Sequence, residues 1–351
     1  MAEDSLVKTG VFKLFHNGSA ISDELLSAIE KVVVEDEINL PSMFVIDFNI
    51  VDFENGSWRG IDLEQFKLGD EIKVLMGMDE TTEMLVGEIA SLEPTFGSRS
   101  TMQIRGFDRL HKLRFGTWRR SFKEMKDSDV ASTIASDAGL TPDVESTDTT
   151  HEYLFQNNLS NFEFLCSRAR RINYEMLVKD KTFTFRKSKE DKAPELTLTL
   201  FSELDQFSAR LKTITQGSKI EVRGWDVKKK EEITASAEAG SENSKMDGNE
   251  SGYELSESAF GASETAIVGS VVVDSADAEN QAKARYNTLL KSFLSGEGEG
   301  PGNALIRAGI TVEIKGVGER FSGTYYVTSS VHSFGFDSGY TSKFRVKRTG
   351  L

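Results

Sequence analysis

The chain has 351 residues, of which 38% are hydrophobic and 28% are charged, and this composition is typical of a soluble globular protein with two or three domains. A formal net charge of −14 argues against a general DNA-binding protein, because an acidic chain repels the phosphate backbone. We find neither a signal peptide nor an apolar run of roughly 18 residues, which a membrane helix needs. The single cysteine, Cys166, excludes an intrachain disulfide and fits synthesis in a reducing cytosol.

Residues 1–108 show the pattern of short β-strands. The segment from Phe44 to Ile50 alternates apolar and polar residues with a period of two, as in a strand with one buried face. Turn sequences such as Asn17-Gly18 separate several segments of this kind. Short strands with turns between them predict a β-barrel or a sandwich.

Helical signals begin after this region and indicate an αβ domain. Asp127 or Ser128 can cap a first helix, and a capping box from Ser160 to Glu163 opens a second one. Cys166 falls on the apolar face of the second helix and is interpreted as a small core residue. The segment from Tyr174 to Lys187 has the pattern of a β-hairpin.

The region that follows is expected to be an insertion. The segment Lys228–Glu264 is rich in Ser, Glu, Ala and Gly and lacks periodicity, so we expect much of it to be a mobile loop. Ser275 then caps a helix that ends at Gly296. The sequence Gly296–Gly302, in which glycine alternates with glutamate and proline, predicts a flexible joint.

One strand unit occurs twice in the chain. The segments Glu71–Asp108 and Ile310–Arg348 each contain an apolar strand, a loop, a second strand, a turn and a third strand. Between them, Glu221–Asp226 resembles Gln103–Asp108. We infer that a β module is duplicated within one subunit, which can therefore contribute two equivalent units to a ring.

The motifs of common catalytic sites are missing from the sequence. The four histidines are scattered, so they predict no metal cluster, and His151–Phe155 lacks the second histidine of a zinc-protease motif. His332 lies in a predicted strand and is interpreted as a histidine with satisfied hydrogen bonds. We find no phosphate-binding loop, dinucleotide-binding motif or nucleophile elbow. We therefore expect a structural protein without catalytic residues, metal or cofactor.

The segment Arg105–Lys126 is basic within an acidic chain, with eight lysines and arginines against two acids. It is either a solvated face or a docking patch for an acidic neighbour. Aromatic residues interleave with the cations and could serve as anchors. The docking hypothesis names Arg105, Phe107, Arg109, Arg114, Trp118, Arg119 and Arg120.

Three stretches resemble the tail hub proteins of contractile phages and injection machines, namely the late control protein D family and the hub portion of type VI spike proteins. They are Arg105–Arg114 with its continuation Phe122–Ala131, then Phe155–Leu165, and finally Asn303–Arg348. The resemblance implies an α+β protein with two tail-tube-like antiparallel β-barrels, an intervening αβ domain and a helical and loop insertion. The first barrel would span 1–108, the αβ domain 109–205, the second barrel 206–227 and 302–351, and the insertion 228–301.

The resemblance also implies a homotrimer on the tail axis, in which two barrels per subunit form a pseudo-sixfold ring. This trimeric hub would join the sixfold tail tube to a trimeric spike. Its implied partners are the tail tube protein, the spike protein, baseplate wedge proteins and tape-measure protein or effector cargo in the channel, without specific nucleic-acid binding or membrane insertion. It would be made in the cytoplasm and assembled into the baseplate of a phage tail or tail-like particle.

Two alternatives of other classes stay open, a tail-associated cell-wall hydrolase and a carbohydrate-binding β module. If the trimer encloses a channel, part of the negative charge is expected to line it, because a like-charged wall repels nucleic acid. Asp47, Glu88 and Glu313 alternate with apolar neighbours and are the candidates for this lining. The competing interpretation is that these acids point outward into solvent.

Overall fold

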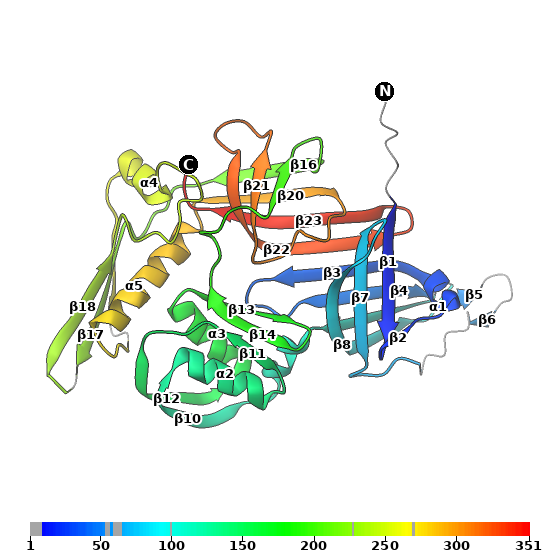
Figure 1. Ribbon diagram of the computed structural model, residues 1–351, viewed down its shortest axis with the longest axis horizontal. Coiled ribbons are helices and arrows are strands. Elements are labelled where there is room, and N and C mark those ends of the chain that lie inside the picture. Colours follow the sequence, from blue (N-terminus) through cyan, green and yellow to red (C-terminus); the bar gives the residue numbers. More distant parts are fainter. Residues whose placement is uncertain (1–8, 53–56, 59–64, 99, 227, 269–270) are drawn as a thin grey trace.

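The computed structural model describes residues 9–52, 57–58, 65–98, 100–226, 228–268 and 271–351. Most strands in these segments belong to one 13-stranded sheet that runs along the molecule (Figure 1). Its main path has the order β16-β20-β23-β22-β3-β4-β9-β8-β7-β1-β2, and β21 and β15 branch from β22. The strands are β1 (Gly10–His16), β2 (Ser19–Ala20), β3 (Ile29–Glu37), β4 (Met43–Asn49), β7 (Glu71–Met78), β8 (Thr82–Thr95), β9 (Thr101–Phe107), β15 (Leu196–Thr199), β16 (Gln206–Leu211), β20 (Leu294–Pro301), β21 (Thr311–Lys315), β22 (Gly323–Gly335) and β23 (Gly339–Arg348).

The first half of the sheet, β1 to β9, has the predicted alternation of buried and exposed side chains. Phe44, Ile46 and Phe48 on β4 point into a core, and the residues between them are half-buried. Helix α1 (Asp23–Ala28), which the sequence analysis did not predict, begins at the cap Ser22 and buries two side chains in the same core. A separate pair, β5 (Val51–Asp52) and β6 (Ser57–Trp58), adjoins this half.

The predicted repeat is present as two antiparallel three-stranded meanders, β7-β8-β9 and β21-β22-β23. The likeness extends further, because β3-β4-β9-β8-β7 and β16-β20-β23-β22-β21 have the same order and are antiparallel at every step. Each long middle strand also has an irregularity in its pairing with the third strand, between Ile89 and Ser91 in β8 and between Val327 and Ser329 in β22. The sixth strands differ, since β1 is antiparallel to β7 and β15 is parallel to β21.

The two halves are joined at β22, which pairs with β21 along its beginning and with β3 along its end. Phe334 and Tyr340 from the second half therefore pack in the core of the first. The pairings of the described strands do not close into a barrel, so the two predicted barrels are not shown, whereas the antiparallel α+β class is confirmed. The long strand β22 merges the two halves into one open sheet instead.

The αβ region has its own hydrophobic core and two small sheets. The predicted capping box of Ser160 and Glu163, the hairpin and the buried position of Cys166 are confirmed. The first helix begins at Asp127, but Lys126 is the capping residue, so that predicted cap was wrong. The elements are η1 (Arg109–Arg114), β10 (Trp118–Lys126), α2 (Asp127–Asp137), β11 (Thr141–Val144), β12 (Thr150–Leu159), α3 (Asn161–Arg171), β13 (Tyr174–Lys179) and β14 (Thr182–Lys187).

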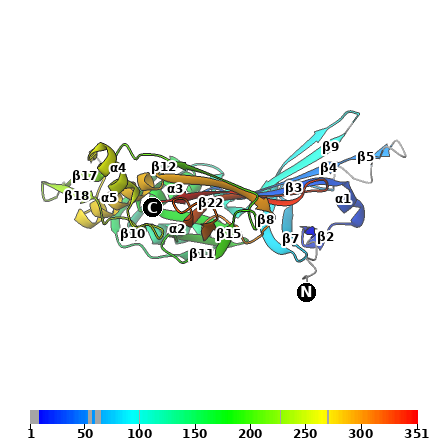
Figure 2. The same ribbon diagram turned by 90° about the horizontal axis from the view of Figure 1, so that it is seen from above.

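The insertion is more ordered than predicted, and Figure 2 shows it at the end of the molecule opposite the first half. Its elements are β17 (Lys219–Asp226), β18 (Glu231–Ala237), α4 (Gly252–Phe260), β19 (Glu264–Val268) and α5 (Ser275–Leu290). The predicted mobile loop is therefore wrong over much of its length, because β18 pairs with β17 and Tyr253 of α4 is buried against Tyr286 of α5.

Three further expectations for this region are corrected. Glu221–Asp226 lies in the separate sheet β18-β17-β19, so its likeness to Gln103–Asp108 does not reflect an equivalent place in the main sheet. Helix α5 is capped by Asp274 and ends at Leu290. Gly296–Gly302, predicted as a flexible joint, is mostly strand β20 in the middle of the second half. The domain boundaries themselves stay a proposal. One hydrophobic cluster lies within the proposed αβ domain, whereas another joins residues of the insertion to residues of the second half.

Candidate interaction surfaces

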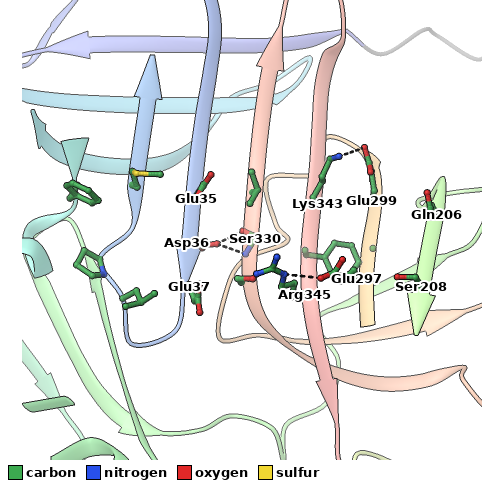
Figure 3. Close-up of a pocket in the computed structure, with 18 of the residues that line it drawn as sticks. Glu35, Asp36, Glu37, Gln206, Ser208, Glu297, Glu299, Ser330, Lys343 and Arg345 are labelled. Carbon is green, nitrogen blue, oxygen red and sulfur yellow. Dashed lines mark hydrogen bonds and ion pairs between the residues drawn. The ribbon is translucent and has the colours of Figure 1, made fainter. Parts of the chain in front are cut away.

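One face of the main sheet is polar and carries a groove of about 600 Å³ (Figure 3). The groove crosses β3, β22, β23, β20 and β16, which lie side by side, and their charged side chains project from this face. Lys343 pairs with Glu299 at 3.0 Å, and Arg345 pairs with Glu297 at 3.1 Å. Because these pairs are solvent-exposed, each stabilises the fold by only about 0–1 kcal/mol. They leave a surface of mixed charge.

Beneath the groove, the junction of the two halves holds a buried polar cluster. The Asp36 carboxylate accepts a hydrogen bond from Arg307 Nε at 2.6 Å and another from the Ser330 hydroxyl. His332 is fully buried beside it, within 2.8 Å of the Ile306 carbonyl and 2.9 Å of the Tyr340 hydroxyl. Its predicted hydrogen-bonded environment is confirmed. Burial, together with the nearby Arg307 charge, lowers the pKa of His332 to about 4, so the imidazole is neutral at pH 7.

Sequence reasoning missed this junction. Asp36 and Arg307 are 271 positions apart, and the resemblance noted for Asn303–Arg348 did not indicate a contact between them. The only sequence signal was the charge of Asp36 within an otherwise alternating strand, where its position falls on the buried side. A buried carboxylate needs a paired charge, so this position could have been marked as one that requires a distant partner.

The three predicted channel residues lie on the same face of the main sheet, by the register of the strands. Asp47 is half-buried and accepts a hydrogen bond from Gln103 at 2.8 Å. Glu88 pairs with Lys112 at 2.6 Å, and Glu313 pairs with Lys315 at 2.9 Å. The structure thus places them on one face but in different neighbourhoods, each with a local partner. Their role in a channel stays a prediction.

The predicted docking residues are divided between buried and exposed positions. Arg109 is buried and pairs with Glu71 and Asp180, so it fastens β7 to the hairpin of the αβ region. Arg105 is half-buried and donates to Gln103. Phe107 stacks on His111 with ring centroids 4.9 Å apart. These three residues serve the internal structure.

Exposed members of the predicted patch lie nearer its end. Arg114 is exposed over the ring of Phe162, and Trp118 is 48% exposed. Arg119 is exposed, whereas the neighbouring Arg120 is half-buried and donates to Gln156 at 3.0 Å and to Asn161 at 2.8 Å.

The pairing of β10 with β12 adds two aromatic residues that sequence reasoning did not include. Arg119 and Lys123 share a face with Tyr153 and Phe155, because Ser121 is opposite Phe155 and Lys123 is opposite Tyr153. Tyr153 is 57% exposed and Phe155 is 41% exposed, and their rings stack at 6.2 Å. We call the surface formed by Arg119, Lys123, Tyr153 and Phe155 the β10–β12 face. Trp118 lies beyond an irregularity in the pairing, and its ring contacts the Arg120 guanidinium instead. The alternation of residues along β12 was the available signal for this face.

Within the described parts of the chain, no three His, Cys, Asp or Glu residues gather in a way that could hold a metal ion. The buried His151 instead lies 3.2 Å from Asp127, whose other carboxylate oxygen accepts from Arg168 at 2.5 Å. None of the helices in the described segments is long and apolar enough to cross a membrane.

Solved structures that are similar to this chain include two tail proteins and a secretion-system component. The prophage MuSo2 43 kDa tail protein from Shewanella oneidensis has a TM-score of 0.73 at 13% identity, over 97% of this chain and 98% of that one. The tail protein from Neisseria meningitidis has a TM-score of 0.71 at 11% identity, over 97% of each chain. The c3393 protein of E. coli, a type VI secretion system component, has a TM-score of 0.57 at 12% identity, over 92% of this chain and 74% of that one.

The fold is therefore that of phage tail proteins and of a related secretion-system component. None of the curated proteins matches the sequence. The chain belongs to the family described as the Alg8 N-terminal domain, whose family model matches residues 6–335.

Proposed function

We propose that the protein is a structural baseplate hub, a homotrimeric adaptor that joins a sixfold tail tube to a trimeric spike. The observation that carries this proposal is the repeated five-strand order in the two halves of the main sheet. Three copies of a two-unit subunit present six similar units around an axis, which matches a sixfold tube without a further adaptor. The shared fold with phage tail proteins supports a place in a tail.

The polar face of the main sheet is the proposed inner wall of the ring. It carries acids such as Asp47 and Glu297 together with Lys343 and Arg345, so the expected negative charge on the wall would be mixed with positive charge. Charged side chains keep this wall hydrated between the apolar side chains that also line the groove, such as Leu40, Met43 and Phe107. A hydrated wall weakens the contacts that would hold a sliding cargo. Glu88 and Glu313 belong to the same face.

The β10–β12 face is the proposed docking site for a neighbouring baseplate protein of acidic character. Partly exposed aromatic rings next to cations are the side chains that most often anchor protein interfaces. We no longer include Arg109 and Arg105 in the docking hypothesis. The Arg109 guanidinium pairs with Glu71, and that of Arg105 donates to Gln103.

The proposal is tested by measuring the mass of the purified chain by light scattering, alone and with its tube and spike neighbours. The expected result is a trimer that appears in electron micrographs as a ring with six similar lobes. A chain that stays monomeric at high concentration and with both neighbours present would refute the hub. Clearing of a peptidoglycan suspension by the purified chain would instead favour the cell-wall hydrolase.

A further inference from the structure

We infer that a second copy of the chain continues the main sheet, by pairing its β16 with the open edge of β8 in the register that joins β22 to β3. The inference rests on the proposed homo-oligomer and adds the strands, the register and the contact residues. It follows from a difference between the two halves, since one edge is occupied within the chain and its equivalent is not.

The occupied edge belongs to β22. The beginning of this strand pairs with β21, and from Ser329 to Gly335 the same edge pairs with β3. In the first half, β8 pairs with β7 only up to Glu88. From Ser91 to Thr95 it pairs with β9 on one side, and no described strand pairs with its other side.

The strand that would fill this edge is also identified by the repeat. Within the chain, β3 pairs with the edge of β22. In the repeated strand order, β16 of the second half is the equivalent of β3 in the first half. Strand β16 is the end of the main path, with β20 as its partner among the described strands. Figure 1 shows β16 at the top of the sheet and β8 near its lower edge. Two different edges in opposite halves of the sheet make a head-to-tail contact, which closes into a ring when the rotation allows it.

The register follows from equivalent positions. In the first half, Ser91 of β8 lies opposite Arg105, directly after the irregularity in that strand. In the second half, Ser329 of β22 lies opposite Arg345, also directly after the irregularity. Ser91 is therefore the equivalent of Ser329. In the next strands, Val45 lies opposite Arg105 and Glu297 lies opposite Arg345.

One strand further, Val33 lies opposite Val45 and Ser208 lies opposite Glu297, so Ser208 is the equivalent of Val33. Within the chain Ser333 lies opposite Val33, and the equivalent of Ser333 is Thr95. The transferred register therefore pairs Thr95 with Ser208, and two residues further along it pairs Glu93 with Arg210.

The side chains that this register brings together are complementary. Glu93 and Arg210 are both exposed and carry opposite charges, and directly opposite pairs of this kind stabilise antiparallel strands. On the reverse face, Leu92 would lie opposite Leu211, and each is already half-buried at the margin of a hydrophobic core. The new pair would join the cores of two copies.

Charge around β16 favours an acidic neighbour. Burial, with Lys212 and Lys291 nearby, lowers the pKa of Lys347, which lies on the same face as Arg210. Glu93 from a second copy would bring a carboxylate next to this group of lysines and Arg210. Pro94 has no N–H, so the ladder would lack one hydrogen bond, and Ser91 to Glu93 would provide its firmest part.

The first test is a disulfide between copies in the variant that combines Glu93→Cys with Arg210→Cys. Mild oxidation is expected to join the chains into species of up to three on a denaturing gel. The matched control combines Glu93→Cys with Gln206→Cys, which lies four residues away on the same edge, and should crosslink several-fold less. Equal crosslinking of the two variants would overturn the register, and the buried Cys166 is common to both.

The second test reverses the charges. Glu93→Arg and Arg210→Glu should each raise the concentration at which the oligomer forms, and their combination should restore it toward the unmodified value. A trimeric protein that shows neither the crosslink nor this rescue would overturn the inferred pairing and leave the proposed hub standing. A protein that stays monomeric with its neighbours present would overturn both.

Discussion

The two halves of the main sheet share a strand plan but differ in how their edges are completed. At the middle of the molecule, β22 and β3 meet over a buried cluster in which Asp36 is held by Arg307 and Ser330. At the equivalent outer edges, β8 and β16 carry exposed Glu93 and Arg210. A junction within one chain forms as the chain folds, so it can hold a buried charge pair. Edges that pair between chains are exposed to water before assembly, so they need side chains that are stable there.

The largest expected effect comes from breaking the inner junction. Asp36→Ala removes the partner of Arg307 and leaves the amide of Ala308 and the Ser330 hydroxyl without their acceptor. We expect the free energy of unfolding to fall by about 3 kcal/mol, as measured by denaturant titration. Glu299→Ala is the matched control on an exposed pair and should cost at most about 1 kcal/mol. Equal losses in the two variants would contradict the distinction drawn between the buried cluster and the groove.

A second effect depends on pH and comes from His332 in the same cluster. Its folded pKa of about 4 lies below the ordinary value of 6.5, so the unfolded chain takes up a proton first as the pH falls. Stability contributed by the neutral histidine is full above pH 6.5 and is lost progressively down to about pH 4, by up to about 3 kcal/mol. In His332→Gln, this loss should be absent when the free energy of unfolding is measured between pH 7 and 4. Parallel profiles for the two proteins would show that another group causes the loss.

A third prediction concerns Gly106, at the position where the second half has Val346. A Cβ on Gly106 would lie 2.3 Å from the Phe44 ring and 2.3 Å from the backbone oxygen of Glu88. Gly106→Ala is therefore expected to lower stability by about 1–3 kcal/mol, measured as a shift of the thermal midpoint. Gly97→Ala, with no atom within 4 Å of the added Cβ, should leave the midpoint nearly unchanged. A neutral Gly106→Ala would mean that the first half can repack like the second.

These residues also show how far the sequence could predict the fold. Local sequence signals were sufficient where contacts between residues close in sequence determine the structure. Examples are the capping box at Ser160 and the alternation around Phe44. Local signals failed at Gly296 and Gly298, because aromatic rings from other strands, Phe207 and Phe344, occupy the space beside these glycines and hold them in β20. A glycine-rich sequence is flexible alone, and only the distant rings make it a strand.

The exposure of the candidate docking residues was harder to predict than the fold, for the same reason. The basic character of Arg105–Lys126 is visible in the sequence, but which cations are free depends on distant partners. Arg109 is occupied by Glu71 and Asp180, and sequence spacing does not show this. Lys228–Glu264 was misjudged in a similar way, since Tyr286 and Asn287 of α5 anchor Glu242 and Asn243.

The smallest expected effect on stability separates two adjacent arginines of the docking hypothesis. Arg120→Ala removes hydrogen bonds to Gln156 and Asn161 that tie β10 to β12 and α3, and it should cost about 1–2 kcal/mol. Arg119→Glu changes an exposed residue and should alter the free energy of unfolding by less than about 0.5 kcal/mol. Denaturant titration of the two variants checks this difference.

The same pair of variants then tests docking. If the β10–β12 face contacts an acidic baseplate neighbour, Arg119→Glu should weaken incorporation of the folded hub into tail particles, because it places like charges together at the contact. Incorporation is measured by the amount of hub that sediments with assembled particles, relative to the tube protein. Reversal of Lys187, an exposed lysine of β14 away from this face, is the control and should leave incorporation unchanged. Normal incorporation of Arg119→Glu would identify the face as solvated surface, and loss with both variants would indicate a general effect of charge rather than a contact at Arg119.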